Sequence, residues 1–102
     1  MRKCIVLDAT VPYCEAYEEF LRCALVPDVD LVAIVGNDCE RWEEAIDMLY
    51  VKMDVTGERP GAFANTTSHP GESLSEAVSF AEQWCSLRGW PKDIHVVKIQ
   101  AS

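Results

Sequence analysis

Three clusters of polar side chains that could carry chemistry follow the apolar runs of this chain. They are Asp8-Ala9-Thr10, Gly36-Asn37-Asp38-Cys39, and Thr66-Thr67-Ser68-His69 with Glu72 a little further on. If the apolar runs are parallel strands, the clusters meet at the carboxyl edge of one sheet, where open α/β sheets bind their ligands. The groups available there are carboxylates, a thiol, an imidazole and hydroxyls.

A thiol and an imidazole together suggest nucleophilic catalysis. Cys39 would lie near the start of a helix, a position typical of reactive thiols. His69 could act as its base, and Asp38 is the adjacent carboxylate. The spacing matches no local nucleophile motif. We therefore assign no catalytic residue and keep Cys39, His69 and Asp38 as candidates.

Phosphate and metal chemistry have less support. The chain contains neither the G-x-G-x-x-G motif nor a P-loop, and the charge of Asp8 at the first strand end repels phosphate. The five cysteines form no C-x-x-C pair and no zinc-finger spacing. We expect no cofactor and no bound metal. A divalent cation held by Asp8 and Asp38 is the alternative.

Helix capping explains the same residue types without a ligand, because Asp, Asn, Ser and Thr are the preferred N-cap residues. Asn37 with Glu40, and Ser73 with Glu76, each have the residue types of a capping box. Capping is the interpretation that we favour for most of these polar residues.

His69 is the residue at which the structural and catalytic interpretations differ. In a structural role, its natural partner is the nearby carboxylate of Glu72. In a catalytic role, its ring must reach Asp8, Asp38 or Cys39 within about 2.6–3.2 Å, or through one water. We expect the structural role, since the sequence supplies a local carboxylate and no nucleophile motif.

The elements that must position these residues follow from apolar periodicity. Residues 4–7 and 31–35 are unbroken apolar runs, typical of parallel strands buried on both faces. Residues 62–67 predict a weaker strand at an exposed end or edge, and residues 94–99 predict a fourth strand. Helices are predicted from Pro12 to Pro27, from Asn37 to Met53, and from Ser73 to Arg88.

This pattern predicts one α/β domain spanning residues 1–102, a small three-layer α/β/α sandwich with four mostly parallel strands. The expected strand order is the flavodoxin-like 2-1-3-4, and 3-2-1-4 is the alternative. The most regular apolar stripe in the chain begins at Trp42. We therefore expect Trp42 to anchor its helix in the core.

The net charge of −8, from 17 acids against 9 bases, favours a basic protein partner or simple solubility. It disfavours direct binding to nucleic acid or to anionic membranes. Carboxylates at helical spacing form two candidate partner surfaces. Their members are Glu15, Glu18, Glu19, Glu40, Glu43, Glu44 and Asp47.

The odd number of scattered cysteines favours free thiols in a reducing cytoplasm. The apolar run after the basic N-terminus stops at Asp8, too soon for a signal peptide. No segment approaches the roughly 20 apolar residues of a membrane span. We expect a cytoplasmic protein.

The chain resembles a family of small, uncharacterised bacterial proteins. In that family a strand-end Gly-x-Asp-Cys precedes a tryptophan helix, and a Thr-Thr-x-His-x-x-Glu turn opens the last helix. The matching residues here are Asp38, Cys39, Trp42, Asp47, Thr66, Thr67, His69 and Glu72. Pro70 and Gly71 replace a more acidic pair. The resemblance implies that Thr67, His69 and Glu72 belong to one shared feature, and it implies no activity.

Two functional hypotheses follow. The first is a non-enzymatic binding protein, such as an inhibitor or immunity-type partner of a basic or nucleic-acid-handling protein, with homodimerisation left open. The second is a small enzyme or ligand-binding domain that uses the sheet edge. Its residues would be Asp8, Asp38, Cys39, His69 and Glu72. We favour the first, because the sequence carries no reaction signature.

Overall fold

The computed structural model describes residues 3–100, in which four parallel strands form one sheet. Strand β1 (Lys3–Ala9) lies between β2 (Val29–Gly36) and β4 (Ile94–Ile99), and β3 (Asn65–His69) pairs with the other side of β2. The order is therefore β3-β2-β1-β4. The predicted order 2-1-3-4 is wrong, and the alternative order 3-2-1-4 is confirmed.

The composition of β3 explains this order. In the order 2-1-3-4, β3 would lie between two strands and both of its faces would be covered. Its sequence, NTTSH, has no apolar side chain to fill such a position. In the observed order β3 is an edge strand, which confirms the expected edge position.

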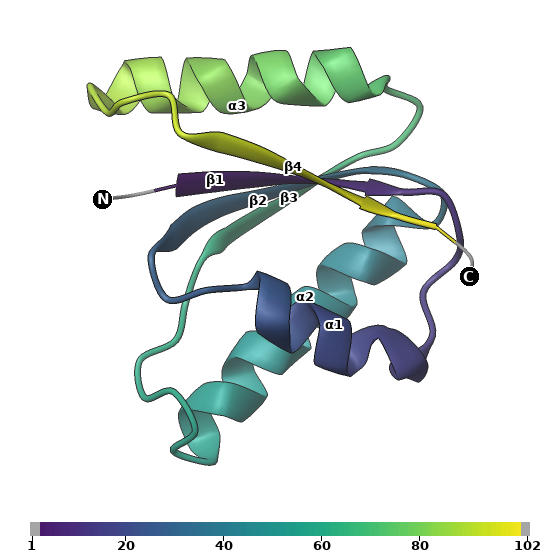
Figure 1. The fold of residues 1–102 in the computed structure, drawn as a ribbon, viewed down its shortest axis with the longest axis vertical. Helices are drawn as coiled ribbons and strands as arrows, with labels where there is room; N and C mark the ends of the chain where they lie inside the picture. Colours follow the sequence, from purple (N-terminus) through teal and green to yellow (C-terminus); the bar gives the residue numbers. More distant parts are fainter. Residues whose placement is uncertain (1–2, 101–102) are drawn as a thin grey trace.

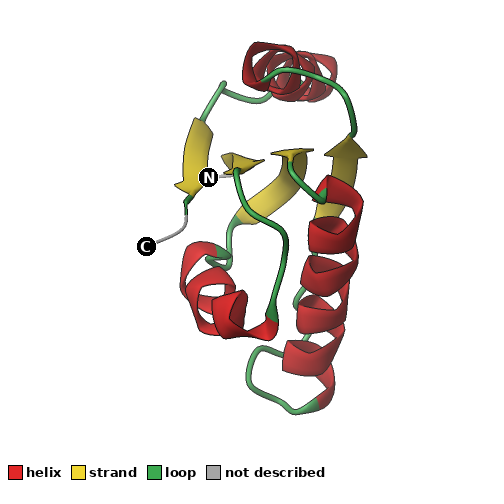
Figure 2. Cartoon of the chain, turned by 90° about the vertical axis from the view of Figure 1, so that its right-hand side faces the viewer, coloured by secondary structure: helices red, strands yellow, loops and turns green. Residues whose placement is uncertain are grey.

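Helices cover both faces of the sheet and make three layers (Figure 1). The 3₁₀ turn η1 (Glu15–Tyr17), α1 (Glu18–Ala24) and α2 (Cys39–Val55) lie on one side, and α3 (Leu74–Arg88) lies on the other. Figure 2 shows the same layers in a view turned by 90°. In the described part of the chain, no helix combines the length and apolar character needed to span a bilayer.

Alternation along the strands divides the core in two. Ile5 and Leu7 face α1 and α2, whereas Cys4 and Val6 face α3. In β2, every residue from 31 to 35 is at most 2% exposed. The expectation of strands buried on both faces is thus confirmed for the two central strands.

The α3 side of the core is built from small side chains. Ala77 and Ala81 are fully buried, and Cys85 is 2% exposed. They pack against the central strands, with Val78, Phe80 and Trp84 partly buried beside them.

The first helix starts later than predicted. Residues 12–14 are not helical, and the 3₁₀ turn begins at Glu15. The preceding segment is held by the second helix instead: Trp42 Nε1 donates to the carbonyl of Val11 at 3.0 Å, and the Tyr13 amide lies 3.4 Å from Asp38 Oδ2. These contacts across the layer override the local preference of Pro12 for a first helical turn.

The predicted capping box of Asn37 and Glu40 is wrong. The N-cap of α2 is Asp38, in the left-handed region at φ 61°, with no side-chain cap bond. The turn is bonded to β1 instead, because the Asn37 amide donates to the Ala9 carbonyl at 2.7 Å. The second predicted box is confirmed, with Ser73 and Glu76 bonded reciprocally at 3.2 Å.

The third strand begins at Asn65, three residues after the predicted start at residue 62. Arg59 and Ala62 close a turn through a backbone hydrogen bond of 3.1 Å. The chain therefore joins β2 only at Asn65, which pairs with Leu31. His69, expected in the following turn, is the last residue of β3.

The role of Trp42 as a core anchor is confirmed. Its side chain is fully buried, and its ring centroid lies 5.0 Å from that of Tyr13 and 5.2 Å from that of Tyr17. With its bond to Val11, it joins α2 to the whole segment between β1 and α1.

Replacing Trp42 by alanine should lower the free energy of unfolding by about 3–5 kcal/mol, because a large cavity forms and two rings lose their partner. Urea denaturation measures this change. Leu87→Ala is the matched control, since Leu87 is 85% exposed and its loss should change stability by less than about 0.5 kcal/mol. Equal midpoints for the wild type and Trp42→Ala would contradict the anchoring role.

Candidate functional site

The sheet separates the polar residues that the sequence places at its carboxyl edge. Cys39 belongs to the core between the sheet and α1/α2 and is 4% exposed. His69 lies on the opposite face, where its ring packs edge-on against Phe80 with centroids 4.7 Å apart. The structure therefore does not bring together the thiol and the imidazole.

The two aspartates of the proposed cation site are also separated. Asp8 alternates with Cys4 and Val6 and so faces the α3 layer, whereas Asp38 approaches the Tyr13 amide on the other side. Asp8 lies beside Lys98 in the sheet register. Among residues 3–100, no group of three or more His, Cys, Asp or Glu side chains is placed to hold a metal ion.

Asp8 and His69 share a face, but Val35 lies between them. Val35 pairs with Asp8 on one side and with His69 on the other. Two strand spacings separate the outer residues by about 10 Å. Of the five strand-end candidates, the structure joins only His69 and Glu72 by a hydrogen bond.

His69 is the centre of a hydrogen-bonded group that we call the His69 clasp, made of Thr67, His69 and Glu72. His69 Nδ1 lies 3.2 Å from Glu72 Oε2, and His69 Nε2 lies 2.8 Å from Thr67 Oγ1. A carboxylate only accepts, so Nδ1 donates to Glu72; in the neutral ring, Nε2 then accepts from the Thr67 hydroxyl. The histidine is 6% exposed. The expected local pairing of His69 with Glu72 is confirmed.

The alternate residues of β3 bind the opposite helix layer. Thr66 Oγ1 donates to Asp47 Oδ1 at 2.6 Å, and Ser68 Oγ donates to Glu43 Oε1 at 3.0 Å. The clasp fixes the turn from β3 into α3, while these two bonds fix β3 to α2. The polar edge strand is thus held from both faces by side-chain hydrogen bonds.

The grouping of Thr67 with His69 and Glu72 was expected from the family resemblance, whereas the bonds of Thr66 and Ser68 to α2 were missed by sequence reasoning. The available signal was the period of two in Thr66–Thr67–Ser68–His69, which sends alternate side chains to opposite faces. This period assigns each side chain to a face only once the strand is known to extend to His69.

Most of the acidic partner-surface candidates are bonded within the protein. Arg22 binds Glu18 and Glu19, and Arg41 binds Glu44. The carboxylates of Glu43 and Asp47 accept the hydroxyls of β3. Glu15 and Glu40 form no such bond with any described residue. The two continuous acidic stripes expected from the sequence are therefore partly neutralised.

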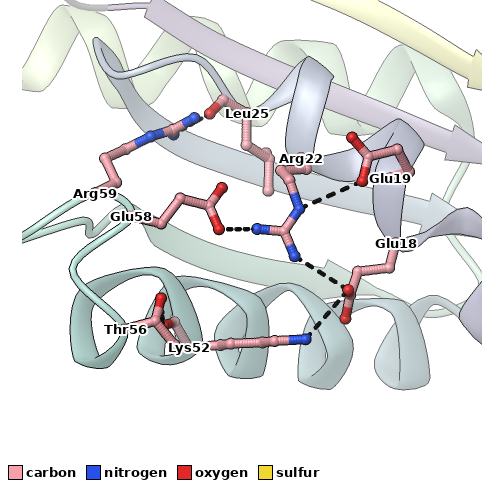
Figure 3. Close-up of polar contacts among 8 residues, drawn as sticks. All are labelled: Glu18, Glu19, Arg22, Leu25, Lys52, Thr56, Glu58 and Arg59. Carbon is pink, nitrogen blue, oxygen red and sulfur yellow. Dashed lines mark hydrogen bonds and ion pairs between the residues drawn. The ribbon is translucent and has the colours of Figure 1, made fainter.

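Figure 3 shows the largest of these groups, centred on Arg22. Its guanidinium contacts Glu18 at 3.1 Å, Glu19 at 3.6 Å and the carboxylate of Glu58 in the loop after α2. Lys52 Nζ of α2 lies 3.4 Å from Glu18. The hydrogen bonds from Arg22 and Lys52 hold the pKa of the Glu18 carboxyl below its usual value.

Two surface grooves lie against α2. The larger, of about 500 Å³, is bordered by Tyr13 and Glu15 on one side and by Glu44 and Met48 on the other. The smaller, of about 330 Å³, lies between Val51 and Phe63. Neither is lined by residues of the His69 clasp.

The exposed face of α2 carries large apolar side chains. Met48, Val51 and Val55 are 67%, 62% and 78% exposed, and their spacing of three and four residues places them on one side of the helix. Phe63, 72% exposed, borders the smaller groove beside Val51. Glu40 is exposed on the same side of the helix, at helical spacing from these residues.

Acidification should remove the stabilisation that Glu18 provides. Because the folded pKa is lowered, this stabilisation is present above the unfolded value near 4.5 and is lost as the pH falls through the lower folded value. Wild type should therefore exceed Glu18→Gln in urea midpoint at about pH 6, and the difference should vanish towards about pH 3. Glu82→Gln on α3 is the control. A difference that stays constant across this range would contradict the Arg22 network.

Replacing His69 by alanine should cost about 2–4 kcal/mol, since it opens a cavity under Phe80 and removes the clasp. His95→Ala is the matched control, because the side chain of His95 is 51% exposed on the edge strand β4, and its loss should cost less than about 0.5 kcal/mol. Guanidinium denaturation followed by tryptophan fluorescence gives both values. Similar losses for the two variants would exclude a structural clasp.

Comparisons with known proteins give one result. No curated protein and no solved structure matches the chain. A family model described as a domain of unknown function, DUF7684, matches residues 2–99. This supports the expectation of a family without an assigned activity. Since the match covers nearly the whole length, the chain belongs to the DUF7684 family, a domain of unknown function.

Proposed function

We propose that this protein binds a basic protein partner through the exposed face of α2, in the manner of an inhibitor or immunity-type protein, and is not an enzyme. The observation that carries the proposal is the row of Met48, Val51 and Val55, each more than 60% exposed. Single exposed apolar residues are normal, whereas an apolar row at helical spacing is typical of a docking surface.

Charge indicates the chemistry of the partner. Glu40 and Glu44 are exposed beside the apolar row, and the chain as a whole carries a net charge of −8. Carboxylates around an apolar centre complement a segment that presents Lys or Arg beside apolar side chains. The occupant that fits is a basic amphipathic helix of another protein, with its apolar residues against Val51 and Phe63.

Burial of these exposed apolar side chains would release enough free energy to support binding. Burying one exposed side chain of the size of Met or Val contributes about 1.5–3 kcal/mol. Together, Met48, Val51, Val55 and Phe63 would form an apolar centre comparable with a small hot spot, even after the entropy lost when side chains are fixed on binding is subtracted. Val51 and Phe63 already border a groove, so the partner side chain would enter a formed depression.

We also propose a cytoplasmic location and a bacterial source, with Gly-x-Asp-Cys and Thr-Thr-x-His-x-x-Glu as family motifs. Contacts within the fold support the motifs as shared features. Gly36 at φ 104° lies against Ala9, Asp38 begins α2, and the His69 clasp uses the second motif. Free thiols at all five cysteines support a reducing compartment.

Capture from the native host tests the binding function with paired variants. Tagged wild type should retain a basic protein, and Glu40→Lys/Glu44→Lys should weaken its binding at least about tenfold. Val51→Ser should also weaken it, by loss of the apolar centre. Binding of the captured protein should fall as salt is added.

The controls lie on α3, away from this face. Glu82→Lys matches the charge reversal, and Leu87→Ser matches the apolar truncation, since both residues are exposed. Retention of the same protein by all four variants would exclude the α2 face as the docking surface.

A second candidate function is an enzyme at the sheet edge, and one observation favours it. Thr67, His69 and Glu72 follow the order hydroxyl, imidazole and carboxylate that activates a nucleophile. Hydrolysis of p-nitrophenyl acetate, abolished in Thr67→Val but retained in Thr67→Ser, would support it. We favour binding, because both grooves against α2 lie apart from this group.

A further inference from the structure

Two thiols meet in the core on the α3 side of the sheet. Cys4, near the start of β1, and Cys85, in the last turn of α3, have their sulfurs 3.4 Å apart. Their side chains are 1% and 2% exposed. The two residues are 81 positions apart in the chain. The pair therefore joins the central strand to the helix layer that covers it.

A disulfide between these two residues requires the sulfurs to move toward each other. A disulfide requires a sulfur separation of about 2.05 Å, so the two atoms must approach by about 1.4 Å. The buried cluster to which both thiols belong also contains the small side chains of Ala33, Ala77 and Ala81. Cys39, on the other side of the sheet, belongs to the separate core.

We propose that Cys4 and Cys85 form a redox modification site, at which a hydroperoxide converts the thiol pair into a disulfide between β1 and α3. One thiol, as thiolate, attacks the outer peroxide oxygen. The O–O bond breaks, the attacked oxygen stays on sulfur as a sulfenic acid, and the other oxygen leaves as hydroxide or alkoxide, which takes up the proton lost by the thiol to give water or an alcohol. The second thiol then attacks the sulfenic sulfur and releases water. Two thiols are oxidised by two electrons, and one peroxide is reduced.

The position of the pair makes this reaction slow and selective. Burial, with the hydrogen bond between the Cys4 thiol and the Cys85 sulfur, raises the pKa of Cys4 to about 12, so little of it is thiolate at neutral pH. Access requires opening of the last turn of α3, whose C-cap is Gly89. Helix ends open at lower cost than the core. The site therefore responds to sustained exposure to peroxide and not to brief contact.

The disulfide would bind α3 covalently to the sheet. Cross-linking residues 81 positions apart removes conformations from the unfolded chain and so raises the melting temperature. The oxidised protein should therefore melt at a higher temperature than the reduced protein, and dithiothreitol should reverse the change.

The test uses folded full-length protein in which the exposed cysteines are removed, Cys14→Ser/Cys23→Ser. Hydrogen peroxide is added, remaining thiols are alkylated after denaturation, and peptides are mapped by mass spectrometry. We expect one disulfide, between Cys4 and Cys85, while Cys39 remains alkylated as the internal control. The oxidised sample should also show the higher melting temperature.

A second variant, Cys85→Ala added to the same background, should form no intramolecular disulfide and show no peroxide-dependent shift in melting temperature. Failure of the folded protein to form the Cys4–Cys85 disulfide under sustained peroxide would overturn the proposal. So would equal consumption of Cys39, or a disulfide that forms only after the protein has been denatured.

Discussion

The absence of a side chain at Gly36 is the constraint on which the α1/α2 layer depends. A Cβ at this position would lie 2.2 Å from the carbonyl oxygen of Ala9, and the residue adopts φ 104°. Because both conditions require glycine, β2 can end directly against β1 and turn at once into α2. The amide of the next residue then bonds to the same carbonyl. α2 therefore starts at a fixed distance from the end of β1, and Trp42 reaches the carbonyl of Val11.

The sequence alone predicts those features whose cause is local. The central strands were predicted because their apolar runs have no polar face, and the Ser73 cap because its partner is three residues away. The start of the first helix and the Asn37 cap were wrong because contacts from another element decided them. The strand order depends on which edge accepts a polar strand, and the bonds of β3 to Asp47 and Glu43 of α2 hold it at the outer side of β2.

In the candidate site, too, contacts with a local cause could be predicted and contacts decided by other elements could not. The pairing of His69 with Glu72 could be predicted because both residues lie in one turn. Cys39 and His69 both lie at the carboxyl edge of the sheet, yet they belong to opposite faces, and nothing in their spacing reveals which face each takes. The acidic stripes are real as helical patterns. Arg22 and Arg41 offset part of their charge, and the hydroxyls of β3 donate hydrogen bonds to two of the carboxylates.

The small side chains on the inner face of α3 limit which substitutions this helix can accept. Ala77 and Ala81 are fully buried against the central strands, so they set the distance between α3 and the sheet. A larger residue at either position has to push the helix outward, which would also separate Cys4 from Cys85. Among members of the family, side-chain volume at positions 77 and 81 should therefore vary together with the retention of the two thiols, whereas the outer face of α3 is free to change.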